Sequence, residues 1–309
     1  MTRTPRFVHA AIAAVCSTGF ATAGVVALDA PDDGRGDLRS PVDLLRSTVS
    51  YSGAMGIANG PGRLEASEYE LRYLMARRLN QIAGWNTIPL VSYTLTTLDF
   101  SGTAAGFPAS DEGLHSIDIN KFFFRSFGDN GKWLAGGWTR AGLSTDFQHL
   151  TTDDLFFDVA AAVGYRFNER FAFGIGVAAF DLSGDTKVIP APSFDWVIDE
   201  RTRAGLYGPY LIVNHEFGDD WQFGIRGEPG GGTWNIRDDA GRSRNIQLSS
   251  YRLGVNANRR LTGEWWLGVM VGTTLGNEIE VRDPSGGNRV KNDLGESMFG
   301  QVMLRLRSW

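Results

Sequence analysis

Residues 155–183 read LFFDVAAAVGYRFNERFAFGIGVAAFDLS, and this stretch decides the fold. From Leu155 to Phe167 every second residue is apolar, with mostly small or charged residues between them. The alternation resumes at Phe171 after three turn residues. Because successive side chains of a strand point to opposite faces, the pattern predicts two strands joined by a tight turn, each with one apolar face.

The same unit occurs five times along the chain: an apolar end, a few turn residues and an aromatic restart. The units are spaced roughly 40 to 50 residues apart, which indicates repeated supersecondary units. They begin at Leu79, Phe127, Phe167, Phe217 and Leu261, and their restarts include Trp85, Trp133, Phe171, Trp221 and Trp265.

Extending the alternation over the chain predicts about twelve strands, each long enough to cross a bilayer when tilted. The predicted strands are 47–57, 65–79, 86–100, 115–126, 132–144, 155–167, 171–183, 203–217, 221–235, 246–261, 265–280 and 297–307. Longer connections (101–114, 145–154, 184–202, 236–245 and 281–296) alternate with the tight turns. This asymmetry is typical of an all-β fold, a single antiparallel up-and-down transmembrane β-barrel with both termini in the periplasm.

A soluble β-sandwich or lipocalin-like barrel would show the same alternation with its faces inverted. Three observations favour the membrane. Aromatic residues gather at one end of the strands, as in an interfacial girdle. The small residues on the other face suit a crowded lumen, and the N-terminus resembles an export signal.

The faces can be assigned strand by strand. The residues expected to face lipid are Leu155, Phe157, Val159, Val163, Phe173, Ile175, Leu253, Val255, Val269 and Val271. Pro89 and Pro209 interrupt predicted strands, so we expect them at strand ends or bulges. Segment 115–126 alternates poorly, and Trp309 is out of phase with the apolar face of the last strand.

The first 23 residues resemble a signal peptide, with Arg3 and Arg6 ahead of a short apolar run and a small-residue cleavage site at 21–23. The run is short for a membrane anchor. Residues 24–46 are expected to be a periplasmic linker, and 47–309 the barrel. The single cysteine, Cys16, lies in the signal, so the mature chain needs no disulfide framework.

The stretch from Leu143 to Trp234 resembles an uncharacterised family of bacterial outer-membrane β-barrels, a domain of unknown function. The resemblance rests on Leu143-Ser144-Thr145-Asp146-Phe147, Tyr165-Arg166-Phe167 leading to Gly174-Ile175-Gly176-Val177, Pro190-Ala191-Pro192 with Trp196, and Leu206-Tyr207-Gly208-Pro209. The resemblance implies a barrel in the outer membrane and brings no known activity.

The charges on the predicted inner face are the main functional lead. They are Glu68, Glu70, Arg72, Asp158, Arg166, Arg226, Arg252, Arg260, Arg305 and Arg307. Charged lumen residues tune the selectivity of a pore, and here arginine predominates. One hypothesis is a narrow passive pore for small polar or anionic solutes. The alternative is a closed structural barrel in which these charges pair.

An outer-membrane lipid-modifying enzyme is a second alternative, but the catalytic candidates are weak. His115 and Ser116 are adjacent on a strand and therefore point to opposite faces. His149 lies among acidic residues in a predicted loop. No cofactor or metal motif is complete, and the net charge of -5 argues against nucleic acid. The expected partners are outer-membrane lipid and, through the C-terminal strand, the barrel assembly machinery.

Overall fold

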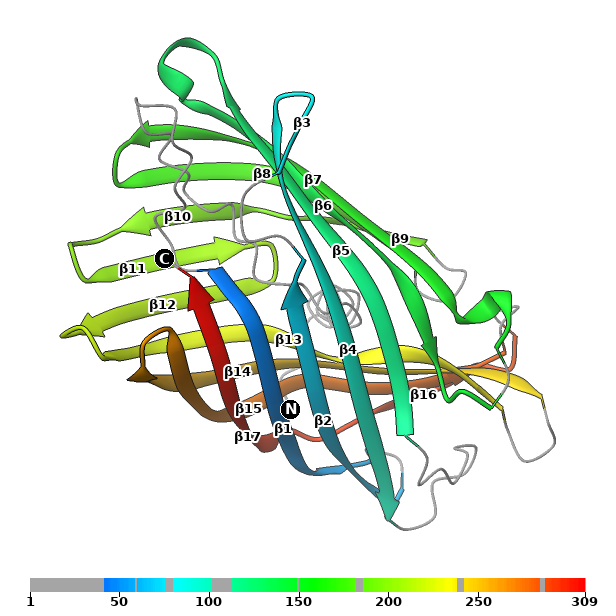
Figure 1. The fold of residues 1–309 in the computed structure, drawn as a ribbon. Helices are drawn as coiled ribbons and strands as arrows, with labels where there is room; N and C mark the ends of the chain where they lie inside the picture. The colour runs from blue at the N-terminus through cyan, green and yellow to red at the C-terminus, as the bar shows by residue number, and fades with distance from the viewer. Residues whose placement is uncertain are drawn as a thin grey trace, which may run out of the picture.

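The computed structural model describes residues 42–58, 60–75, 80–101, 113–148, 150–181, 186–237, 242–283 and 287–308, which form an antiparallel β-barrel (Figure 1). Its strands are β1 (Val42–Gly56), β2 (Arg63–Leu74), β3 (Asn80–Ile82), β4 (Trp85–Ser101), β5 (Gly113–Phe127), β6 (Trp133–Thr145), β7 (Leu155–Asn168), β8 (Phe171–Asp181), β9 (Thr186–Pro190), β10 (Ser193–Val197), β11 (Thr202–Tyr207), β12 (Tyr210–Phe217), β13 (Trp221–Arg237), β14 (Ser243–Thr262), β15 (Trp265–Arg282), β16 (Val290–Asp293) and β17 (Ser297–Ser308). Short 3-10 turns, η1 (Asp129–Gly131) and η2 (Thr152–Asp154), lie between strands.

The barrel closes where the last strand meets the first. β17 pairs with β15 on one side and with β1 on the other, and Val42 lies opposite Ser308. Within the described residues, fourteen strands form the wall, rather than the predicted twelve or so. Three short strands are not counted separately. β9 and β10 lie end to end along β8, β3 pairs with the start of β4, and β16 pairs with the loop-end part of β15.

The additional wall strands come from two segments that the sequence pattern assigned differently. The predicted strand 203–217 is a hairpin, β11 and β12, with Tyr207 opposite Tyr210. Gly208 takes a φ of 60° in the turn, a conformation that glycine adopts readily, and Pro209 follows it at the strand end. The predicted loop 184–202 contains β9 and β10, which are separated at Ala191 and Pro192.

Pro89 stands inside β4, opposite Met75 at the end of β2. The carbonyl of Pro89 accepts a hydrogen bond from the Met75 amide. Two opposite residues of such an antiparallel pair normally exchange two hydrogen bonds, and proline has no N–H for the second. Pro89 therefore removes one ladder bond, at the point where β2 ends.

The tight turns lie at one end of the barrel, hereafter the turn end, together with the first and last described residues. Four of the five predicted turns lie where the sequence pattern placed them; at the first, Asn80 and Gln81 belong to β3, and the chain reverses at Ala83 and Gly84. The longer connections lie at the other end, hereafter the loop end, with the tight β11–β12 turn as the exception. β1 begins at Val42, so the last five residues of the predicted linker belong to the wall.

The assignment of faces on the wall is confirmed. Eight residues of the predicted outward set are exposed, from Val163 at 43% to Ile175 at 62%. Val159 and Leu253 are half-buried on the same face. Their inward neighbours Asp158 and Ala160 are buried, and segment 115–126 also alternates regularly, with Ile117 and Ile119 outward.

Aromatic side chains form a band on the outer surface at the turn end. Trp133 contacts Tyr165, which in turn contacts Phe167, with ring centroids 5.1 and 5.2 Å apart. Farther around the wall, Trp221 stacks on Phe223 at 5.6 Å. Such belts mark the interface between hydrocarbon and water in membrane barrels.

The interior is partly filled by apolar side chains. At the loop end, residues from β1, β2, β4 and β5 pack across the lumen against β13, β14 and β15, with Leu64, Leu114, Ile246 and Ile279 fully buried. A second cluster, from Leu44 of β1 to Phe180 of β8, lines the inner wall. Among the described residues there is no helix long and apolar enough to cross a membrane.

Candidate functional site

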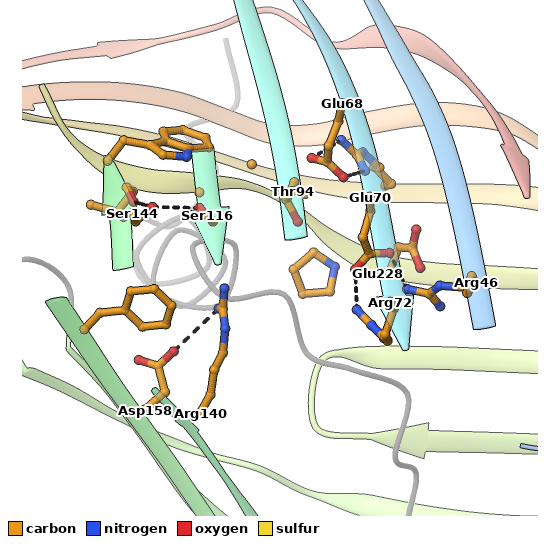
Figure 2. A pocket seen from close by; sticks show the side chains of 18 of the residues that line it. Arg46, Glu68, Glu70, Arg72, Thr94, Ser116, Arg140, Ser144, Asp158 and Glu228 are labelled. Atoms are coloured by element: carbon orange, nitrogen blue, oxygen red, sulfur yellow. Dashed lines mark hydrogen bonds and ion pairs between the residues drawn. The ribbon is translucent and has the colours of Figure 1, made fainter. Parts of the chain in front are cut away.

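A polar cavity of about 100 Å³ lies in the lumen beneath the apolar cluster at the loop end. Figure 2 shows two groups of side chains that face each other across it. One group comes from β1, β2, β13 and β14, and the other from β5, β6 and β7. The cavity lining is polar because the strands around it carry polar residues at their inward positions and apolar residues at their outward positions.

The first group is a network of ion pairs around β2. Glu70 lies between Arg46 and Arg72 and pairs with both, with the Arg46 Nη2 2.6 Å from a carboxylate oxygen. Glu68 pairs with Arg252 of β14 at 3.2 Å, and Arg226 pairs with the next inward residue of β13, Glu228, at 2.6 Å. Arginine suits these positions because its planar guanidinium can donate several hydrogen bonds at once.

The second group is centred on Arg140 of β6. Its guanidinium lies 3.3 Å from Asp118 and 3.6 Å from Asp158 and also stacks over the Phe156 ring. Asp118 accepts a further hydrogen bond from the Ser92 hydroxyl at 2.8 Å. These carboxylates are nearly inaccessible to water, so their pairing with Arg140 compensates for lost hydration.

Two hydroxyl groups bind each other beside this cluster. Ser116 Oγ and Ser144 Oγ are 2.7 Å apart, and the Ser144 hydroxyl also lies 2.6 Å from the Thr233 carbonyl of β13. Ser144 thereby connects β6 to the loop-end part of β13. A single bridge between Thr145 and Asn235 accompanies this contact.

Among the charges that line the cavity, the six anions outnumber the five cations by one. The cations are Arg46, Arg72, Arg140, Arg226 and Arg252, and the anions are Glu68, Glu70, Asp153, Asp154, Asp158 and Glu228. Opposite charges held within about 4 Å cancel each other's field at longer range. The cavity therefore lacks the excess positive potential on which the predicted anion preference depended.

The ten predicted lumen residues divide into two sets. Glu68, Glu70, Arg72, Asp158, Arg226 and Arg252 line the cavity. Arg166, Arg260, Arg305 and Arg307 occupy inward positions of their strands nearer the turn end. There Arg305 donates to Asn258, and Arg307 donates to Gln222 at 3.0 Å and pairs with Asp43 at 3.4 Å.

Four central residues were missing from the sequence prediction: Arg46, Asp118, Arg140 and Glu228. Arg46 was assigned to the linker. Asp118 was hidden in the irregular-looking segment 115–126, although it occupies the inward phase between Ile117 and Ile119. Arg140 and Glu228 carry the same signal, a charge in the inward phase of a strand.

The catalytic candidates do not converge in the structure. Ser116 is buried in the lumen, whereas the His115 ring lies on the outer face, 2.9 Å from the Tyr93 hydroxyl and beside Phe147. The two adjacent side chains thus point to opposite faces, as strand geometry requires. His149 lies outside the described residues. Among the residues described, no group of His, Cys, Asp or Glu has the arrangement of a metal site.

An antiparallel barrel with an apolar exterior, an aromatic band and a polar, ion-paired interior is the architecture of transmembrane β-barrels. The chain belongs to the family defined by the domain of unknown function DUF6268, whose model matches residues 91–285. No curated protein matches the chain significantly in sequence.

Several solved structures are similar to this chain at low sequence identity. An outer membrane channel of the COG4313 group from Pseudomonas putida F1 is 14% identical, covering 87% of this chain and 97% of that chain, with a TM-score of 0.48. The toluene transporter TodX from P. putida is 9% identical, with 85% and 89% coverage and a TM-score of 0.34. The translocator domain of the autotransporter NalP from Neisseria meningitidis is 9% identical, with 85% and 88% coverage and a TM-score of 0.30. Likenesses at this level carry no argument about function.

Proposed function

We propose that the chain is a bacterial outer-membrane β-barrel whose lumen is closed to free diffusion. The outward apolar residues, the aromatic band and the even number of wall strands support the membrane location. Soluble proteins rarely expose a contiguous apolar surface of this kind, which here runs around the wall.

The pairing of the lumen charges carries the closed-barrel proposal. Arg252, Arg226 and Arg72 each bind a carboxylate from the same lumen, and Arg140 binds two. Freeing one of these groups to coordinate a passing ion would leave its partner buried and uncompensated. The apolar cluster at the loop end adds a second barrier, since ions do not enter a dry apolar constriction.

Planar-bilayer recording of the purified barrel tests closure. A closed lumen predicts a baseline without stable conductance steps in concentrated KCl. The variant Arg252→Ala removes one partner of the Glu68 pair and serves as a sensitised control. Stable steps in the wild-type barrel, with a reversal potential in a salt gradient that indicates anion preference, would contradict the closed lumen and restore the pore hypothesis.

The location has a separate test. A membrane barrel resists dissociation in detergent, so heated and unheated samples should migrate differently in gel electrophoresis. A protein that folds as a soluble monomer without detergent or lipid would contradict the proposed location, whatever the conductance.

The second candidate function is a narrow pore. The observation in its favour is the polar cavity itself, since a purely structural barrel has no need for water-sized space among its ion pairs. The narrow pore predicts small but reproducible currents in the same recordings, and these should change when Arg140→Ala alters the cavity wall.

A further inference from the structure

The β2 group of ion pairs, on one side of the polar cavity, has one positive charge in excess. Arg46 and Arg72 share a single carboxylate, that of Glu70. The other two pairs of this group each join one arginine to one glutamate and add no net charge. Four arginines and three glutamates of the group line the cavity, so its net charge is +1. The Nε atoms of Arg46 and Arg72 are buried and have no hydrogen-bond partner among the described residues.

The β6 group, on the other side, has the opposite imbalance. One guanidinium, that of Arg140, pairs with two carboxylates, those of Asp118 and Asp158. Asp154 of η2 adds a further carboxylate that lines the cavity and is only 3% exposed. Its Oδ2 accepts a hydrogen bond from the Thr151 amide, whereas its Oδ1 has no partner among the described residues. Because buried carboxylates are normally paired, this oxygen indicates a site for a donor that a ligand supplies.

The two imbalances lie on opposite walls of one cavity and produce an electric field across it. Figure 2 shows Arg46, Glu70 and Arg72 on one side and Arg140 with Asp158 on the other. A solute with a single charge is attracted by one wall and repelled by the other, whereas a zwitterion that lies along the field is attracted by both. The field therefore selects a solute that carries both charges.

Hydroxyl groups supplement the charges. The Ser116 and Ser144 side chains line the same cavity, and each hydroxyl both donates and accepts hydrogen bonds. They can therefore bind the ammonium or the carboxylate group of a zwitterion. The burial of both charged groups is compensated by the walls, which removes the main cost of placing ions in a closed lumen.

The size of the cavity limits the solute. A protein cavity of about 150 Å³ holds benzene. The cavity here has a volume of about 100 Å³ and so has room for a molecule of roughly four or five non-hydrogen atoms. Free glycine, the smallest α-amino acid, fits this limit, whereas amino acids with large side chains exceed it.

We propose that the cavity is a binding site for a small zwitterion of the size of free glycine. Its ammonium group binds Asp154, and its carboxylate faces the Arg46–Glu70–Arg72 trio. The inference goes beyond the closed lumen, because binding requires the charges of the cavity and no open path through the barrel. The apolar cluster covers the cavity at the loop end, so we expect the bound solute to exchange slowly with the surrounding water.

Refolding in the presence of radiolabelled glycine tests the site without requiring an entry route. The purified chain is unfolded in urea and refolded into detergent micelles with the labelled glycine, and gel filtration then removes the unbound label. The site predicts close to stoichiometric retention of glycine by the folded barrel. A wild-type barrel that is folded but retains no label would overturn the proposal.

Unlabelled competitors of similar size, present during refolding, identify the two ends of the site. Acetate carries only the negative charge, methylammonium carries only the positive charge, and acetamide carries neither. Each should need a concentration at least about tenfold higher than unlabelled glycine to halve the retained label, because it leaves one wall or both without a charged partner. If acetamide or either ion competes as well as glycine, at least one wall takes no part in binding and the proposal is overturned.

The variant Asp154→Asn removes the charge at the ammonium end and keeps an acceptor for the Thr151 amide. The glycine concentration needed for half-maximal retention should rise at least about tenfold. The matched comparison, Asp153→Asn, removes the same charge from the neighbouring residue, whose exposed side chain is screened by water and salt. Its effect should be much smaller, and equal losses in the two variants would overturn the assignment of Asp154.

Heat modifiability separates failure of the site from failure of the barrel. The competition assay uses only the wild-type protein, so it decides the proposal even if Asp154→Asn does not fold. If the wild-type protein forms a detergent-resistant barrel without selective glycine binding, the binding site alone is overturned. If it forms no such barrel, the proposed function fails first, and the binding site fails with it.

Discussion

Arginine placed at Val255 provides a sharp test of the outward face. Val255 is 59% exposed on β14, and its partners on both neighbouring strands, Ile225 and Val271, are outward as well. A soluble barrel would tolerate an exposed arginine here, usually within about 0.5 kcal/mol. A lipid-facing position would not.

The magnitude follows from the depth of the residue. Val255 lies about six residues along β14 from Leu261, at the turn end. At ~3.3 Å per residue and a tilt of ~40°, this places it about 15 Å above the aromatic band, close to the middle of an apolar belt of about 25 Å. Arginine at the midplane of a membrane barrel costs roughly 2–4 kcal/mol.

The matched control is Leu261→Arg, on the same strand and similarly exposed at 52%, but at the interface. Its expected cost is about 0–1 kcal/mol. Reversible denaturant unfolding in phospholipid vesicles gives the free energy of unfolding for the wild-type protein and both variants. If Val255→Arg has the same free energy of unfolding as the wild type, or if the two arginine variants lose the same amount, the outward face does not contact lipid.

Three further predictions concern the lumen and the turns. Glu70→Gln leaves Arg46 and Arg72 without their shared carboxylate, and breaking such a buried pair costs about 3–5 kcal/mol; unfolding titrations should show this loss, while Glu216→Gln on the exposed end of β12 should be nearly neutral. Gly208→Ala should lower the free energy of unfolding by about 1 kcal/mol. The cause is the left-handed backbone at Gly208 and not a clash, since an added Cβ would have only Ala191 nearby, at 3.8 Å. Gly300→Ala, at an ordinary φ with open space, is the control, and equal effects of the two substitutions would argue against the β11–β12 turn. The backbone N–H of Arg201, with the Thr202 hydroxyl, lowers the pKa of Asp199 in the β10–β11 turn. Because its pKa is lowered, this carboxylate stabilises the folded turn at pH values above its ordinary range and loses that effect as the pH falls through the lowered value. The protection factors of amides 199–202, which correct for the slower intrinsic exchange in acid, should therefore fall on acidification in the wild-type protein but not in Asp199→Ala.

The wall was largely predictable because alternation is a local property. Each strand from 155 to 181 carries its own two faces, and the tight turns at 168–170 and 218–220 have glycine, asparagine or aspartate where the chain reverses. A regular hydrophobic period and turn chemistry therefore located most strands without any knowledge of their partners.

The strand count was wrong where local signals conflicted. Gly208-Pro209 is a turn signal, but it lies at the loop end, where long connections are expected, so 203–217 looked like one strand. β9 and β10 are five residues each and are separated by Ala191 and Pro192, too short for alternation to stand out.

The cavity depended on contacts that no local pattern reveals. Glu68 and Arg252 are 184 positions apart and pair only because the barrel closes. The sequence could place both on an inner face, but it could not show whether the arginines stood free or neutralised. Arg140, the centre of one group, carries the local signal of a charge in the inward phase, but its carboxylate partners lie on the strands on either side and are known only from the fold.

The measurement that tests the central claim most directly is a nitroxide scan of β14 in lipid vesicles, with single labels from Arg252 to Arg259. A membrane barrel predicts high accessibility to oxygen and low accessibility to a water-soluble nickel chelate at Leu253, Val255 and Ala257. The inward positions Arg252, Asn256 and Asn258 should be poorly accessible to oxygen. High accessibility of 253, 255 and 257 to the nickel chelate would show that this face meets water and would contradict the membrane barrel.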